Sequence, residues 1–143
     1  MNRSIDMAVP ASRLRRALKL LIVDDSNVMR RRIERSQQVD QLEVVGLASD
    51  GLEAIDLFRR TDPDVVTMDI TMPCMDGIEC VSRLVQMKPD VLILVVSALA
   101  DKATAVEAME KGANGFLNKP FTDRQLNDAL EELIAGAQAK TSP

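Results

Sequence analysis

The chain has 143 residues, 46% of them hydrophobic and 28% charged, with a formal net charge of −4. This length suits one domain with a buried core, and the acidic balance with three Phe as the only aromatic residues argues against nucleic-acid binding, which needs basic faces and stacking platforms. No apolar run has the length of a membrane span, and the N-terminus lacks the continuous apolar segment of a secretory signal, so no membrane association is expected.

The cysteine content indicates the cellular compartment, and the composition of the two ends of the chain indicates the domain boundaries. Cys74 and Cys80 are too few and wrongly spaced for a zinc site or a disulfide framework, and free thiols fit a reducing cytoplasm. Residues 1–17 show no clear periodicity and are expected to form a flexible arm. We expect the domain over residues 18–138 and a tail at 139–143.

The first predicted strand is the apolar run Leu20–Val23, which ends on Asp24 and Asp25. Ser26 or Asn27 can cap the helix that follows, because both side chains can accept a hydrogen bond from the first helical turn. The chain therefore passes from a buried strand into a helix at a pair of acids.

The first predicted helix places Met29 and Ile33 one turn apart on its inner face. Its basic residues suggest a solvated face, because consecutive residues point in different directions; they are Arg30, Arg31, Arg32 and Arg35. A second strand is expected over residues 43–48. The second helix follows Asp50-Gly51 and is marked by the apolar residues Leu52, Ile55, Leu57 and Phe58.

The third strand is predicted over residues 64–68, where Val and Thr favour a buried, pleated surface. It ends on Asp69, and the chain breaks at Pro73. Taken alone, Asp69 could simply cap the turn after the strand. The next helix has apolar residues at helical spacing and ends at Lys88-Pro89-Asp90; these apolar residues are Ile78, Val81, Leu84 and Val85.

Residues 91–96 are apolar throughout, which is typical of a strand covered on both faces, and they end on Ser97. An Ala-rich helix is expected from Asp101 to Gly112, a residue suited to closing a helix. The apolar residues of this helix are Val106 and Met109.

The last strand contains Phe116-Leu117 and ends near Lys119. A cis bond between Lys119 and Pro120 is expected, because it lets the ammonium turn back towards Asp69 while Phe121 packs before the last helix. That helix begins near Thr122 and turns its apolar residues inward: Leu126, Leu130, Leu133 and Ile134.

Five strand–helix repeats predict an α/β fold, a three-layer doubly wound (βα)5 sandwich around a parallel five-stranded sheet. Right-handed crossovers leave few topologies, and the order 2-1-3-4-5 is a common one, with its ligand crevice between strands 1 and 3. In that order the polar strand ends share one rim of the sheet: Asp24, Asp25, Asp69, Ser97 and Lys119.

Three carboxylates on one rim repel each other, since two unit charges about 4 Å apart cost about 4 kcal/mol at an effective dielectric near 20. One lysine does not neutralise three acids, whereas a hard divalent cation does, and oxygen ligands favour Mg²⁺, with Mn²⁺ as an alternative. Beside such a cation Asp69 can act as a nucleophile and form an aspartyl phosphate. Lys119 and Ser97 would then donate to the phosphoryl oxygens. Without a cation, the close carboxyl groups should have raised pKa values.

Four segments of the chain resemble a known family: residues 21–26 (LIVDDS), 69–77 (DITMPCMDG), 96–98 (VSA) and 119–121 (KPF). In this order they are similar to the receiver domain of two-component response regulators, and the likeness runs from about Leu20 to Leu133. The chain is most similar to stand-alone, CheY-like chemotaxis receivers and to the receiver half of chemotaxis methylesterases.

The resemblance implies that Asp69 accepts a phosphoryl group from a sensor histidine kinase or a histidine phosphotransfer protein. Asp24 and Asp25 would hold Mg²⁺ together with Asp69 and the backbone carbonyl of Thr71. The domain would catalyse only its own phosphorylation and dephosphorylation, without being a conventional enzyme.

The resemblance also implies how the signal is passed on. Ser97 and Lys119 would bind the phosphoryl group, and Phe116 would occupy the aromatic switch position, with helix 4, strand 5 and helix 5 forming the face for a protein target. Phe116 replaces the tyrosine of chemotaxis receivers, so a switch that needs a phenolic hydrogen bond is unavailable. The end of the first helix, Ser36-Gln37-Gln38, is more polar than the family pattern and is expected to be short or frayed.

Three alternatives remain at this point. A flavodoxin-type electron carrier shares the topology, but its phosphate loop needs Gly, Ser or Thr where this chain has Asp24 and Asp25. A haloacid-dehalogenase-type phosphatase needs a second Asp two residues after the nucleophile, where this chain has Thr71. The chain could also be the receiver half of a longer regulator with a methylesterase or DNA-binding output domain. That the sequence ends soon after Ile134, without a linker, favours a stand-alone protein.

Overall fold

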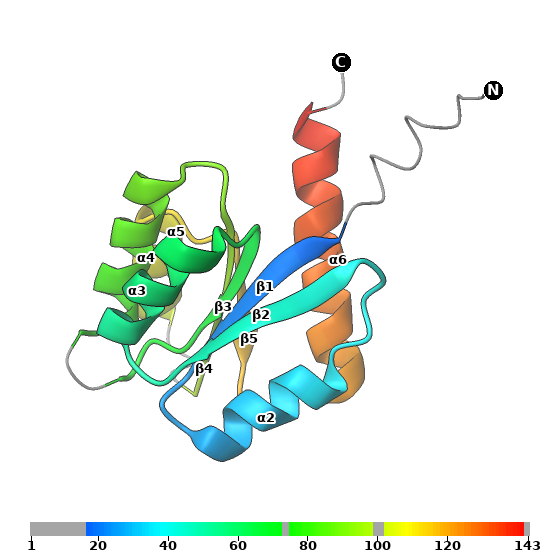
Figure 1. The fold of residues 1–143 in the computed structure, drawn as a ribbon, viewed down its shortest axis with the longest axis horizontal. Coiled ribbons are helices and arrows are strands. Elements are labelled where there is room, and N and C mark those ends of the chain that lie inside the picture. The colour runs from blue at the N-terminus through cyan, green and yellow to red at the C-terminus, as the bar shows by residue number, and fades with distance from the viewer. Residues whose placement is uncertain (1–16, 73–74, 99–101, 142–143) are drawn as a thin grey trace.

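A computed structural model describes residues 17–72, 75–98 and 102–141. Its centre is a sheet of five parallel strands in the order β2-β1-β3-β4-β5, as predicted (Figure 1). The strands are β1 (Leu18–Val23), β2 (Leu42–Ala48), β3 (Val65–Met68), β4 (Leu92–Ser97) and β5 (Gly115–Asn118).

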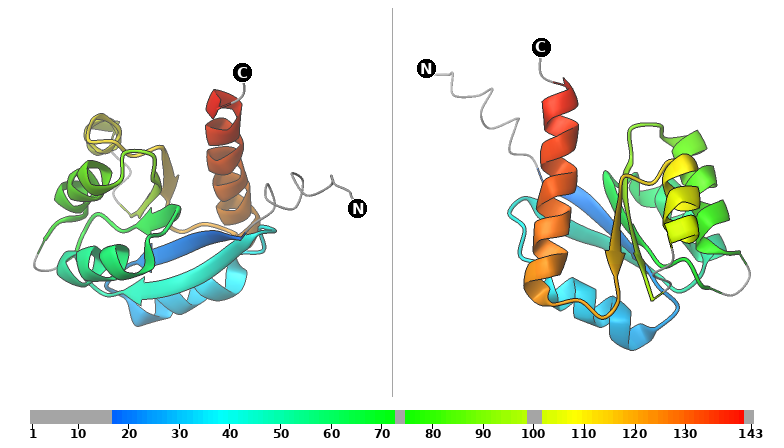
Figure 2. Two further views of the ribbon diagram at one scale, coloured as in Figure 1. Left: turned by 45° about the horizontal axis from the view of Figure 1, so that its top comes forward. Right: turned by 180° about the vertical axis from the view of Figure 1, so that it is seen from behind.

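Helices cover both faces of the sheet, which makes the three layers expected from the strand–helix repeats (Figure 2). One face carries α2 (Asn27–Ser36) and the long helix α6 (Asp123–Thr141). The other face carries α3 (Gly51–Thr61), α4 (Gly77–Met87) and α5 (Lys102–Glu110). Within the described residues, no helix is long and apolar enough to cross a membrane.

The core consists of two apolar layers, one on each side of the sheet, because successive strand residues point to opposite faces. In β1, Leu20 and Ile22 pack towards α2 and α6, whereas Leu21 and Val23 pack towards α3 and α4. All four are at most 1% exposed. The prediction that the continuous apolar runs form strands covered on both faces is confirmed.

Side chains at the helix ends fix where the strands turn into helices. Ser26 caps α2 by accepting a hydrogen bond from the Met29 N–H. At its other end, α2 is tied to α6, since the side chain of Asn127 donates to the Ser36 carbonyl and accepts from the Gln38 N–H. The polar end of this helix, expected to be short or frayed, is therefore held by α6.

Several apolar residues used to identify helices do not face the core. Leu52 is 57% exposed at the start of α3, and Val106 and Met109 are 46% and 45% exposed on α5. The buried residue of α5 is Ala108, so this helix packs through a small side chain and carries its larger ones outward. The expected helix start at Asp101 lies outside the described residues.

Two further expectations concern the ends of elements. The Lys119–Pro120 bond is cis, as predicted. Helix α6 continues to Thr141, past the boundary at residue 138 expected for the domain. The arm at 1–16, Pro73 and Cys74 lie outside the described residues.

Candidate functional site

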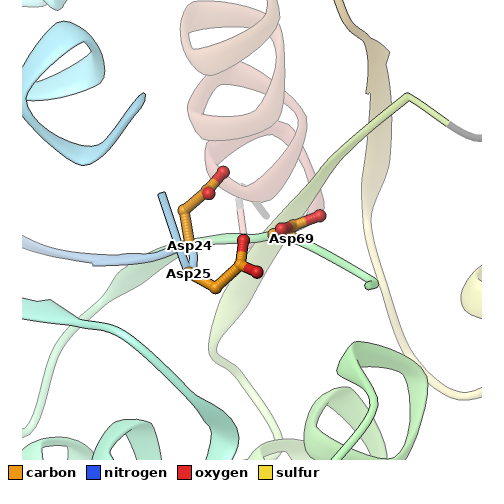
Figure 3. Close-up of side chains that lie close together, drawn as sticks. All are labelled: Asp24, Asp25 and Asp69. Atoms are coloured by element: carbon orange, nitrogen blue, oxygen red, sulfur yellow. The ribbon is translucent and has the colours of Figure 1, made fainter. Parts of the chain in front are cut away.

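Three carboxyl groups converge at the carboxyl ends of β1 and β3 (Figure 3). The two strands are paired with Val23 beside Met68, which sets the following residues, Asp24 and Asp69, next to each other. One carboxylate oxygen from each of Asp24, Asp25 and Asp69 lies within 4.8 Å of the other two. The sequence-based prediction that these acids meet is confirmed.

The three acids differ in their exposure to solvent. Asp24 and Asp69 are 1% and 3% exposed, whereas Asp25 is exposed. Burying a carboxylate is unfavourable unless a cation or hydrogen bonds compensate. The site therefore combines a buried pair of carboxyl groups with one acid that is open to solvent.

Lys119 supplies a cation to the buried pair. Its Nζ lies 2.8 Å from the Asp24 carboxylate and 3.8 Å from that of Asp69, and its side chain is 17% exposed. The ammonium was expected to aim at Asp69, but its short contact is with Asp24. One lysine thus serves two buried acids and leaves the cluster with excess negative charge.

The pKa of Asp69 reflects this environment. Burial raises the pKa of the Asp69 carboxyl from 3.8 to about 6, and the nearby Asp24 carboxylate adds to the rise. The Lys119 ammonium and the hydrogen bond from the Thr71 N–H lower the pKa and offset part of that rise. Lys119 and Thr71 therefore offset only part of the effect of burying Asp69 beside Asp24.

Thr71, expected to offer its backbone carbonyl to a cation, folds back towards Asp69. Its N–H and its hydroxyl both lie at hydrogen-bond distance from Asp69 Oδ1, at 3.3 and 3.4 Å. These contacts hold the loop after β3 against the acid.

Ser97 and Phe116 lie on the neighbouring strands β4 and β5. Ser97 is fully buried at the end of β4, and its carbonyl accepts a hydrogen bond of 2.8 Å from the Lys119 N–H. Phe116 is half-buried and packs against the core on the side of α3, α4 and α5. Four of the five strands thus hold predicted site residues at or just after their carboxyl ends, on one rim of the sheet, whereas Phe116 lies nearer the start of β5.

Gly77 is a site residue that the sequence named only as part of a segment. Its N–H donates to the Ile70 carbonyl at 2.7 Å, so the start of α4 lies against the loop after β3. A Cβ at this position would lie 2.2 Å from the backbone oxygen of Asp69. Only glycine allows this close approach. The sequence did not reveal it, because Gly77 lies eight residues after Asp69 and no sequence pattern shows that the two backbones meet.

Two arginines that were assigned to a solvated face instead have partners in distant elements, and one of these partners is a residue of the site. Arg30 donates to the backbone carbonyl of Asp24 at 2.7 Å. Arg32 lies over the ring of Phe121, with 4.3 Å between Cζ and the ring centroid. Sequence reasoning missed both because a run of arginines does not reveal which members meet a partner from a distant element.

Cys80 plays no part in this cluster. It is buried in α4 as a free thiol, and its Sγ lies 3.8 Å from the Gly51 carbonyl. Burial raises the pKa of Cys80 to about 12, so it is protonated at neutral pH and unreactive.

The donor set fits a hard divalent cation. Carboxylate oxygens from Asp24, Asp25 and Asp69 are close enough to share one ion, and Asp25 is exposed to solvent. Mg²⁺ and Mn²⁺ prefer such ligands.

A family model, the response regulator receiver domain, matches residues 20–131. The chemotaxis protein CheY of Listeria monocytogenes is 41% identical over 115 residues, which cover 80% of this chain and 97% of that protein. A protein-glutamate methylesterase/protein-glutamine glutaminase of Photobacterium profundum is 42% identical over 120 residues, but the match covers only 30% of its length.

Solved structures give the same result. The response regulator domain of Thermotoga maritima CheB is 38% identical, with a TM-score of 0.74, and the match covers 90% of this chain and 100% of that domain. A complex of CheX and CheY with BeF3 and Mg²⁺ from Borrelia burgdorferi contains a chain that is 28% identical, with a TM-score of 0.78, over 82% of this chain and 89% of that one.

Proposed function

The chain belongs to the response regulator receiver domains, and from this premise we propose that it is a single-domain response regulator that is phosphorylated on Asp69. Two-component, chemotaxis-type signalling is the setting that its CheY relatives indicate. The observation that carries the proposal is the buried Asp69 carboxyl, gathered with Asp24, Asp25 and Lys119 at the rim of the sheet.

Asp69 is the nucleophile in this proposal. With a pKa of about 6, the carboxyl is mostly ionised at pH 7 and less strongly solvated than an exposed acid. A carboxylate oxygen attacks the phosphorus of a phosphohistidine on a sensor kinase or phosphotransfer protein. The P–O bond forms as the P–N bond breaks, and the electron pair of that bond stays on the imidazole, which takes up a proton.

Asp24, Asp25 and Asp69 would hold Mg²⁺, with the Thr71 backbone carbonyl as a further ligand. When bound, Mg²⁺ supplies positive charge that offsets the acids and the transferring phosphoryl oxygens. The chain's own contribution is to hold three oxygens within 4.8 Å of one another before any ligand arrives.

Lys119 and Ser97 would stabilise the phosphoryl group. The Lys119 ammonium already lies 3.8 Å from Asp69, so a small movement away from Asp24 would let it donate to a phosphoryl oxygen. Ser97 would donate its hydroxyl from the end of β4. Water attacking the phosphorus in line would release phosphate and regenerate Asp69, so the domain would act only on itself.

The output would pass through α5, β5 and α6, which correspond to helix 4, strand 5 and helix 5 of the family. The aspartyl phosphate adds a charge of roughly −1.5 to −2, which would draw Ser97 towards the phosphoryl group and let Phe116 turn inward. Phe116 borders a surface groove of about 480 Å³ whose other wall includes Gln125 and Leu133 of α6. A downstream protein target would bind there, and we place this pathway in the cytoplasm.

A second candidate is the receiver half of a longer regulator. The methylesterase relatives favour it, because the matching segment makes up only 30% of one such protein. Against it stands the 97% coverage of the Listeria CheY. The intact mass of the protein isolated from its source cells decides between the two.

Mass spectrometry after incubation with acetyl phosphate and Mg²⁺ tests the proposed chemistry. One phosphoryl group should be added to the wild type, it should be lost on raising the pH, and Asp69→Asn should take up none. Steady release of phosphate from small esters would instead identify a phosphatase. Undiminished labelling of Asp69→Asn would place the acceptor elsewhere.

A further inference from the structure

Arg32 joins two segments that are 89 residues apart in the chain. It lies in α2, and its guanidinium stacks over the Phe121 ring with 4.3 Å between Cζ and the ring centroid. One of its nitrogens donates to the backbone carbonyl of Phe121, and the same nitrogen lies 3.6 Å from the Asp123 carboxylate. Ring, carbonyl and carboxylate all belong to the junction between β5 and α6.

This junction also carries Lys119, two residues before Phe121. Phe121 is 4% exposed and packs in the apolar layer beneath α2 and α6. Arg32 therefore covers the buried ring on its outer side and binds the carbonyl that follows it. Movement of Phe121 would be passed through one residue to the backbone of Lys119.

The backbone of the junction is anchored on both sides of Phe121. Before it, the Lys119 N–H donates to the Ser97 carbonyl at 2.8 Å. After it, the Thr122 hydroxyl accepts from the Gln125 N–H at 3.0 Å and so holds the start of α6. Arg32 adds a third contact, at the middle of the junction, and this contact comes from α2, the helix that follows Asp24 and Asp25.

The chemistry of the contact requires arginine. An apolar side chain could cover the ring but could not bind the carbonyl, and a lysine could bind one acceptor but has no planar group to stack on the ring. With 30% of its side chain exposed, Arg32 is partly shielded from solvent, which strengthens its contacts relative to those of a free surface arginine.

We propose that Arg32 is a positioning residue that holds the β5–α6 junction so that the Lys119 ammonium stays over Asp24 and Asp69. The inference rests on the proposed function, because the role of Lys119 in binding the phosphoryl group belongs to that proposal. It predicts that Arg32 affects phosphoryl recognition through Lys119, without touching the reacting atoms itself.

Beryllofluoride, a stand-in for the phosphoryl group, tests the inference by calorimetry at saturating Mg²⁺, since the chain has no Trp or Tyr to report binding. Arg32→Met should weaken beryllofluoride binding about fivefold to tenfold. This is part of the loss expected if Lys119 no longer made its charge-assisted hydrogen bond to beryllofluoride, because Lys119 would be displaced and not removed. The affinity for Mg²⁺ alone should not fall, because the three acids remain. The exposed Arg31→Met on the same helix should change neither.

The decisive measurement repeats Arg32→Met in a Lys119→Met background. If Arg32 acts through Lys119, the substitution should then leave beryllofluoride affinity unchanged within about twofold. An equal loss in both backgrounds, or a parallel loss of Mg²⁺ affinity, would show a merely structural role and overturn the inference. Arg32→Lys, which keeps the charge, should bind with intermediate affinity and provides a folded variant if Arg32→Met unfolds.

The same titrations separate this inference from the proposed function. A wild-type protein that binds no beryllofluoride in the presence of Mg²⁺ would refute the proposed phosphorylation site. A wild-type protein that binds it, together with an unaffected Arg32→Met variant, would refute only the role of Arg32.

Discussion

Lys119 makes its short ion pair with Asp24, at 2.8 Å, although Asp69 is the residue proposed to carry the phosphoryl group. The ammonium therefore pairs with one of the three acids proposed to hold Mg²⁺, so Lys119 and Mg²⁺ would compete for Asp24. Phosphorylation offers Lys119 a new partner, and its transfer from Asp24 to a phosphoryl oxygen would couple cation binding to phosphoryl binding.

The first prediction follows from this competition. Lys119→Met should raise the affinity for Mg²⁺ by about tenfold at low salt, because a unit charge a few ångströms from the ion is removed. The same variant should be phosphorylated far more slowly by acetyl phosphate. Titration calorimetry measures the affinity, and Lys111→Met, an exposed lysine, is the control. Weaker Mg²⁺ binding in Lys119→Met would refute the competition.

The second prediction concerns pH. The pKa of Asp69 is about 6 in the folded protein and near 3.8 in the unfolded chain, so the folded state binds more protons between these values. The contribution of this group to stability is fully present below about pH 4 and is lost as the pH rises through about 6. The loss is on the order of 2 kcal/mol.

Asp69→Asn removes this loss. In buffer with a chelator, the variant should be more stable than the wild type by about 1–2 kcal/mol at pH 7, and the difference should vanish near pH 4. Urea unfolding at both pH values measures it, with Asp40→Asn as an exposed control. A difference that grows towards low pH would contradict the raised pKa.

Apolar periodicity was enough to predict most of the fold, and the polar residues at the strand ends gave the acids, the serine and the lysine of the site. Thr71 and Phe116 were named only through the family resemblance. The apolar run at residues 91–96 indicated a doubly covered strand, and the order 2-1-3-4-5 places the strand ends Asp24 and Asp69 next to each other. Contacts that depend on side-chain direction were not predictable. Nothing in the sequence tells that Lys119 bonds Asp24 first, or that Arg32 meets a ring 89 residues away.

The third prediction compares two glycines. Gly77→Ala should destabilise the protein by several kcal/mol, because the new methyl would lie 2.2 Å from the Asp69 backbone oxygen, which cannot move without breaking the site. Gly136→Ala, in α6, meets nothing within 4 Å and should stabilise the protein by about 0.5–1 kcal/mol. Urea unfolding measures both. A tolerated Gly77→Ala would mean that α4 does not press on the loop after β3.

The fourth prediction concerns the output face. Amide exchange with beryllofluoride and Mg²⁺ bound should change in α5, β5 and α6, around Phe116, and little in β2 and the helix after it. Phosphorylation-deficient Asp69→Asn should show no such change under the same conditions. Exchange that changed everywhere except at α5, β5 and α6 would exclude the proposed switch.

The last prediction concerns Thr67, in the centre of β3. This residue is 1% exposed, and its hydroxyl is the one buried side-chain polar atom in the described part of the chain that has no hydrogen-bond partner. A buried hydroxyl without a partner costs about 1–3 kcal/mol. Thr67→Val keeps the shape and removes the hydroxyl, so it should raise the free energy of unfolding by about 1 kcal/mol.

Thr67→Ala serves as the comparison, because it removes the same hydroxyl but also leaves a cavity between β3 and the helices α2 and α6. It should be less stable than Thr67→Val by about 1 kcal/mol or more. Urea unfolding at pH 7 orders the three proteins, and phosphorylation by acetyl phosphate should continue in both variants. A Thr67→Val variant less stable than the wild type would contradict the prediction, because it would show that the hydroxyl makes a favourable hydrogen bond, for example to a buried water.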